Sequence, residues 1–173
     1  MKKHTKLECV QGDIARQSDL DAVVNAANAE LKIGGGVAGA IHRAAGPELE
    51  KACRPMAPIR PGQAVITEAF NLPNKYVIHC LGPVYNIDKP SDQLLANCFI
   101  NALSLADEMK LHSIGFPAIS TGAFGFPLEA AAEITAEAVY SVTPNLEYVS
   151  LIRMVLYLAR DMDVFKKSMG VKG

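Results

Sequence analysis

The sequence lacks tryptophan, has few aromatic residues and shows no excess of either charge. Aromatic residues make up 6% of the 173 positions, and the formal net charge is −1. A protein that binds nucleic acid through general electrostatics needs a basic stripe that displaces counterions. The composition therefore argues against general nucleic-acid binding, and an anionic ligand would have to be held locally by backbone amides and helix dipoles.

Long apolar runs are also absent, which argues against a membrane-spanning segment or a membrane partner. Residues 1–6 are basic but lack the apolar segment of a secretion signal, so we expect a soluble, cytoplasmic protein. Half of the residues are hydrophobic. This length and composition predict one domain over residues 1–173, with a core that needs no metal or disulfide.

Cysteine and histidine patterns of a metal site are missing as well. The four cysteines contain no C-x-x-C pair, and the four histidines are not spaced with carboxylates or thiols as ligands on one helix face would be. We therefore expect buried, reduced thiols, no metal and no cofactor.

Two glycine-containing segments stand out. Residues 23–28 (Val-Val-Asn-Ala-Ala-Asn) join an apolar strand to two amides, and Gly34, Gly35 and Gly36 follow just before a helical pattern. Residues 115–127 (Gly-Phe-Pro-Ala-Ile-Ser-Thr-Gly-Ala-Phe-Gly-Phe-Pro) run again from strand to loop to helix. Glycines allow close backbone approach to an anion, and a helix N-terminus favours negative charge, so this order predicts a phosphate-binding site.

Short apolar segments alternate with longer helical patterns, which is typical of an α/β layer structure. We expect strands near residues 7–11, 22–25, 64–68, 76–81, 113–117 and 149–158, and helices over 37–45, 91–110, 127–142 and 162–169. Ser91 is expected as an N-cap and Pro127 as a first helical residue. The predicted fold is a three-layer α/β/α sandwich with a central mixed sheet, and ligands bound beyond the carboxyl ends of its strands.

The most specific motifs are Asn-Ala-Ala-Asn at 25–28, Gly-Gly-Gly-Val-Ala-Gly-Ala-Ile-His at 34–42 and Pro-Ala-Ile-Ser-Thr-Gly at 117–122. With Gly-Asp-Ile at 12–14, they closely resemble the macrodomain family over nearly the whole chain. The resemblance implies the same three-layer fold and a site for ADP-ribose. The ligand-binding residues that it implies are Asp13, Ile14, Asn25, Asn28, Gly34, Gly35, Gly36, Val37, Ser120, Thr121, Gly122, Ala123 and Phe124.

Individual roles follow from the resemblance. Asp13 would accept a hydrogen bond from the adenine amine, Ile14 would supply a backbone N–H to the ring, and the two glycine loops would cradle the diphosphate. Asn28 would hold hydroxyls of the distal ribose, which Phe124 would cover. Asn28, Gly35 and Phe124 are therefore the predicted catalytic residues.

Several side chains have an equally simple structural interpretation. Asp13 could be a turn residue or helix cap, Asn25 a turn former, and the Ser120 and Thr121 hydroxyls could satisfy local backbone groups. Phe124 could be a core plug. His42 and His79 lie in apolar patterns typical of structural histidines, and Tyr157 is either an adenine contact or a core or rim residue.

The chain departs from the hydrolase-like class of the family at one position and from many viral members at another. That class usually carries an aspartate where this chain has Ala38, and many viral members have a histidine where it has Ile33. The resemblance still implies hydrolysis of ADP-ribosyl esters on Asp or Glu of modified proteins, with ADP-ribose and those proteins as partners. Deacetylation of O-acetyl-ADP-ribose and processing of ADP-ribose 1″-phosphate would use the same pocket, and the alternative is a non-catalytic ADP-ribose reader.

Overall fold

A six-stranded mixed sheet forms the centre of the computed structural model, which describes residues 4–172. The strands lie in the order β1-β6-β5-β2-β4-β3, and only β3, at one edge, runs antiparallel to its neighbour. Their bounds are β1 Lys6–Gln11, β2 Ala22–Ala26, β3 Ala64–Glu68, β4 Tyr76–Cys80, β5 Ser113–Phe116 and β6 Leu151–Leu156. The carboxyl ends of the five parallel strands consequently meet at one edge of the sheet.

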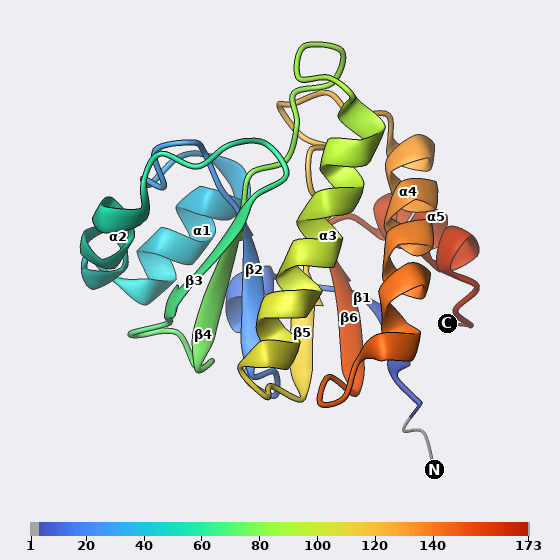
Figure 1. The fold of residues 1–173 in the computed structure, drawn as a ribbon, viewed down its shortest axis with the longest axis horizontal. Helices are drawn as coiled ribbons and strands as arrows, with labels where there is room; N and C mark the ends of the chain where they lie inside the picture. The colour runs from blue at the N-terminus through green and yellow to red at the C-terminus, as the bar shows by residue number, and fades with distance from the viewer. Residues whose placement is uncertain (1–3, 173) are drawn as a thin grey trace.

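Helices cover both faces of the sheet (Figure 1). One face carries α3 Ser91–Glu108, α4 Leu128–Val142 and α5 Ala159–Met169, and the other carries α1 Gly36–Ala45 and α2 Glu48–Cys53. Short 3-10 turns lie at η1 Ile14–Arg16, η2 Arg54–Met56 and η3 Thr143–Asn145. The predicted three-layer α/β/α sandwich is thus confirmed.

Alternation along the strands divides the core into two layers. Phe116 of β5 packs against Phe99 of α3, with ring centroids 4.9 Å apart, in the layer beneath α3, α4 and α5. Val23 of β2 lies instead in the layer that contains Ile41 of α1 and Leu49 of α2. Because successive strand side chains point to opposite faces, a buried parallel strand supplies both layers.

Helix boundaries differ in detail from the expected ones. The six-residue α2 was not predicted, because only Leu49 and Cys53 are buried in it and one turn shows no periodicity. Ser91 is the first residue of α3 and Pro90 its cap, so the N-cap prediction was wrong; the Ser91 hydroxyl donates to Asp88 O at 2.5 Å instead. Pro127 caps α4, which begins at Leu128.

All four cysteines are buried, as expected. Within residues 4–172, no helix combines the length and the apolar character needed to cross a bilayer.

Arg153 of β6 ties the segment between β1 and β2 to the sheet. Its side chain is 13% exposed, and its Nε lies 2.6 Å from Glu8 Oε1. Its Nη1 and Nη2 donate to both oxygens of Asp19 at 2.8 and 2.7 Å, which is a bidentate pair. These hydrogen bonds from the guanidinium hold the pKa of the Asp19 carboxyl below its usual range.

Replacing Arg153 by alanine should lower the free energy of unfolding by about 1–2 kcal/mol, because a largely buried guanidinium loses charge-assisted hydrogen bonds to Glu8 and to the more exposed Asp19, whose contribution is screened by solvent. Urea denaturation measures this. The difference from wild type should shrink as the pH falls below the ordinary carboxyl pKa, since a carboxyl with a lowered pKa stabilises the fold only while it is ionised. Arg160→Ala is the matched control, because that side chain is 81% exposed and 3.9 Å from its carboxylate. An equal effect of both substitutions would contradict the role of Arg153.

Candidate functional site

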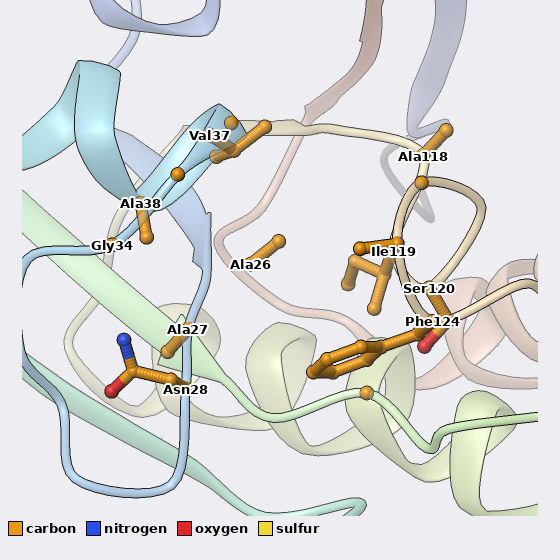
Figure 2. Close-up of a pocket in the computed structure, with 15 residues that line it drawn as sticks. Ala26, Ala27, Asn28, Gly34, Val37, Ala38, Ala118, Ile119, Ser120 and Phe124 are labelled. Carbon is orange, nitrogen blue, oxygen red and sulfur yellow. The ribbon is translucent and has the colours of Figure 1, made fainter.

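Loops that follow the parallel strands enclose a cavity of about 340 Å³ at the carboxyl edge of the sheet (Figure 2). We call it the glycine lobe. Its lining residues are Ala26, Ala27, Asn28, Gly34, Gly35, Gly36, Val37, Ala38, Gly82, Ala118, Ile119, Ser120, Gly122, Ala123 and Phe124. They come from the loops after β2, β4 and β5 and from the start of α1.

A second cavity of about 520 Å³ adjoins the first, and we call it the Asp13 lobe. Its lining residues are Gly12, Asp13, Ile14, Gly36, Val37, Ala40, Arg43, Pro117, Ala118, Thr121, Gly122, Val155, Leu156, Tyr157 and Asp161. Gly36, Val37, Ala118 and Gly122 line both cavities, so the two lobes are parts of one cleft. With one exception, all predicted ligand-binding residues line this cleft.

The exception is Asn25, which is fully buried below the cleft. Strand alternation turns its side chain toward the α1 and α2 layer, where its Nδ2 lies 3.1 Å from Nδ1 of His79. The structure therefore does not bring Asn25 together with the other predicted site residues.

The first glycine loop leads directly into α1. Gly35 is the N-cap of the helix, and Gly36 has φ +54°, a conformation that glycine adopts without strain. The first amides of a helix have no partner within it, so α1 presents unpaired N–H donors at the place where both lobes meet.

The second glycine-containing loop, which includes Ile119 and Ser120, packs closely over Gly82. Ser120 has φ +68°, and a Cβ on Gly82 would lie 2.1 Å from its Oγ and 2.6 Å from Cγ2 of Ile119. The Ser120 hydroxyl is buried without a partner, whereas the Thr121 hydroxyl donates to Ala118 O at 2.8 Å. The Thr121 side chain thus satisfies a local backbone group, as its simpler interpretation predicted.

Asn28 fixes the loop that precedes the glycines. Its Nδ2 donates to Lys32 O at 2.8 Å, and its Oδ1 accepts from Lys32 N at 3.0 Å. In Figure 2 this amide points away from Phe124. Each amide atom can form one further hydrogen bond, so Asn28 keeps a donor and an acceptor for a ligand.

Asp13 is both a helix cap and a lining residue. Its Oδ1 accepts from Ala15 N at 2.9 Å at the start of η1, and Oδ2 lies 3.9 Å from Nε of Arg16. The side chain is 43% exposed. The carboxylate therefore remains open to a hydrogen-bond donor in the Asp13 lobe.

Charge distinguishes the two lobes. Among the residues that the structure describes, no charged side chain lines the glycine lobe, whereas the Asp13 lobe contains Asp13, Arg43 and Asp161. An anion in the glycine lobe would therefore be bound by backbone amides. Over residues 4–172, no group of three or more His, Cys, Asp or Glu side chains is arranged to hold a metal ion.

The two buried histidines lie outside both lobes. Burial, with a smaller effect from His42, lowers the pKa of His79 to about 3, and burial also lowers the pKa of His42. Both rings are therefore neutral near pH 7, which suits structural residues and not a general acid in the cleft.

Sequence reasoning missed several lining residues. Gly82 lies two residues after the end of β4 and could have been found from its place near a parallel strand end. Ala40 and Arg43 follow Gly36 at helical spacing, so they share its face of α1. Asp161 was not predictable, because the final helix begins three residues earlier than expected.

The comparisons with known proteins agree with this geometry. The family model of the Macro domain matches residues 24–135. A macro domain-containing protein of Chlorobaculum tepidum is 40% identical over 170 residues, which cover 98% of each chain. Another, from Methanosarcina mazei, is 43% identical over 165 residues, covering 95% of this chain and 88% of the relative. The chain therefore belongs to the macrodomain family.

Solved structures show the same similarity. The Oceanobacillus iheyensis macrodomain with ADP has a TM-score of 0.88 at 41% identity, covering 94% of this chain and 88% of that chain. The Trypanosoma brucei macrodomain in complex with ADP-ribose has a TM-score of 0.86 at 33% identity, covering 93% of this chain and 68% of that chain.

Replacing Gly82 by alanine should destabilise the protein by about 1–3 kcal/mol, because overpacking forces the Ser120 loop to move. Thermal unfolding measures the loss. The matched control is Gly122→Ala in the same cleft, where an added Cβ meets nothing within 4 Å. If Gly82→Ala were as stable as Gly122→Ala, the close contact would not restrain the loop.

Proposed function

We propose that the chain binds ADP-ribose in the two-lobed cleft and hydrolyses ADP-ribosyl esters, removing mono-ADP-ribose from Asp or Glu of modified proteins. The observation that carries this proposal is the union of an uncharged, amide-rich lobe with a lobe in which the partly exposed Asp13 carboxylate can accept a further hydrogen bond. The macrodomains with ADP and with ADP-ribose support it, because they share the fold at 41% and 33% identity.

In this proposal the adenine occupies the Asp13 lobe. The Asp13 carboxylate accepts a hydrogen bond from the exocyclic amine, which favours adenine over a base that presents a carbonyl oxygen there. Ile14 supplies a backbone N–H. Tyr157, which is 79% exposed at the rim of this lobe, can cover the base.

The diphosphate then lies where the lobes meet. Residues 34–37 form one wall and residues 120–124 the other, so amides and the α1 dipole bind the charge without lysine or arginine. The distal ribose enters the glycine lobe between Asn28 and Phe124. The amide of Asn28 can donate to one hydroxyl and accept from another.

Hydrolysis in this lobe would depend on the positioning of a water and the ester more than on a strong base. Ala38 lines the glycine lobe where the hydrolase-like class has its aspartate, and no described lining residue there titrates. A water held against a phosphate oxygen would attack C1″ of the distal ribose. The bond between C1″ and the carboxyl oxygen would break, the Asp or Glu would leave as a carboxylate, and the water proton would pass by way of the phosphate oxygen to solvent. Fixing that water can lower the barrier by several kcal/mol, on the order of hundreds to thousands in rate. O-acetyl-ADP-ribose and ADP-ribose 1″-phosphate would use the same pocket.

The alternative is a reader that binds ADP-ribose without hydrolysing it. Ala38 and the lack of a titrating group in the described lining favour this alternative. Binding would then be as tight, but the ester would remain intact.

Asp13→Ala should weaken ADP-ribose binding by about 1–3 kcal/mol, because a hydrogen bond to a charged acceptor is lost. Isothermal titration calorimetry measures the dissociation constant. Arg16→Ala is the matched control, since that side chain is 86% exposed and touches the same carboxylate from outside the lobe. Unchanged affinity in Asp13→Ala would rule out the adenine role of Asp13.

Release of ADP-ribose from a protein mono-ADP-ribosylated on glutamate should occur with wild type, be lost in Asn28→Ala and increase in Ala38→Asp. The wild-type rate should vary little between pH 6 and 8 apart from the hydroxide dependence of the ester itself, because the base is not a protein side chain. Tight binding without release by wild type would identify a reader. Release by Ala38→Asp alone would show that the missing carboxylate is the reason.

A further inference from the structure

Asn25 belongs to a polar cluster in the core beneath the cleft. The register places Asn25 of β2 beside His79 of β4, and Nδ2 of the amide lies 3.1 Å from Nδ1 of the ring. The other ring nitrogen, Nε2, lies 3.0 Å from Oγ1 of Thr67 on β3 and 3.6 Å from Sγ of Cys53 on α2. His79 thus connects three adjacent strands and the helix that covers them.

This polar cluster stabilises the core less than apolar side chains would. Oδ1 of Asn25 and Nε2 of His42 are buried without partners, and the two histidine rings are 6.5 Å apart. A buried polar atom without a partner destabilises the fold, and an apolar residue of similar shape would avoid that cost. The amide at position 25 is therefore poorly explained by core stability alone.

The cluster lies directly before the residues that line the glycine lobe. Ala26, Ala27 and Asn28 follow Asn25 in the chain and all line that lobe. Just past the end of β2, the Ala27 N–H donates to the carbonyl oxygen of Cys80, the last residue of β4, at 2.8 Å. A shift of the Asn25 side chain would therefore move the end of β2 first.

We propose that Asn25 is a positioning residue, whose amide on His79 fixes the carboxyl end of β2 and thereby places Asn28 for the distal ribose. The ring remains neutral near pH 7, since burial lowers the pKa of His79 to about 3, so the restraint does not depend on pH in the physiological range. The inference rests on the proposed ADP-ribose binding. It assigns Asn25 to the support of the site and not to ligand contact.

Two near-isosteric apolar substitutions test this role. Asn25→Leu removes the β2 partner of His79, whereas Thr67→Val removes its β3 partner and leaves the end of β2 untouched. ADP-ribose and ADP are the ligands, because ADP lacks the distal ribose. In Asn25→Leu the dissociation constant should rise on the order of tenfold for ADP-ribose and about twofold or less for ADP, since small misplacement at one lobe penalises only the group bound there. Thr67→Val should change neither value by more than about twofold.

Amide hydrogen exchange at Ala27 provides a second readout, in ligand-free protein. Asn25→Leu should accelerate exchange there by on the order of tenfold relative to Thr67→Val, under conditions in which both variants are folded by circular dichroism. Equal losses for both ligands, or unchanged binding with unchanged exchange, would overturn the positioning role. If wild type bound neither ligand, the proposed function would fail, and exchange at Ala27 would still decide whether Asn25 fixes the strand end.

Discussion

Tight packing at two glycines, against side chains at Gly82 and against backbone at Gly39, is the constraint on which the cleft depends. Gly82 leaves no room for a Cβ beneath the Ser120 loop, and a Cβ on Gly39 would lie 2.5 Å from the carbonyl oxygen of Gly34. At Gly82 the loop that contains Ser120 packs against the chain that follows β4. At Gly39 the glycine loop packs against α1. Parallel strands bring the loops to one edge, but these contacts determine how narrow the space between them is.

A narrow space between backbones explains how a chain of net charge −1 can accommodate an anion. Amides at the start of α1 supply donors where the lobes join, and charged side chains are confined to the Asp13 lobe among the described residues. Backbone donors cost no side-chain entropy and are already oriented, which suits the proposed diphosphate site. The same arrangement leaves the glycine lobe without a titrating group among its described lining residues. Any rate acceleration there would therefore come mainly from the positioning of the reacting groups.

The sequence predicted the sheet, the three layers and the loops at the strand ends, because apolar strands, glycine loops and alternating helices are local patterns. It missed α2, where two buried residues in one turn give no period, and it misplaced the cap of α3, where tertiary contacts of Ser91 with the preceding loop decide its role. Gly82 lies near a parallel strand end and Arg43 shares a helix face with Gly36, so sequence patterns could have indicated both. Asp161 enters the cleft only through the packing of α5 against the sheet, which its spacing along the chain could not show.

The two asparagines of one motif lie in different environments: Asn25 is buried in the core, and Asn28 lines the cleft. Two residues, Ala26 and Ala27, separate them, and the strand ends at the first of these. Asn25 still follows the two-residue alternation and faces His79, whereas Asn28 has left the strand and holds the loop through Lys32. An amide in each place restrains the backbone on either side of the two alanines that line the lobe. Because the lobe contains no strong base at position 38, the proposed hydrolysis would depend on the accuracy of that restraint.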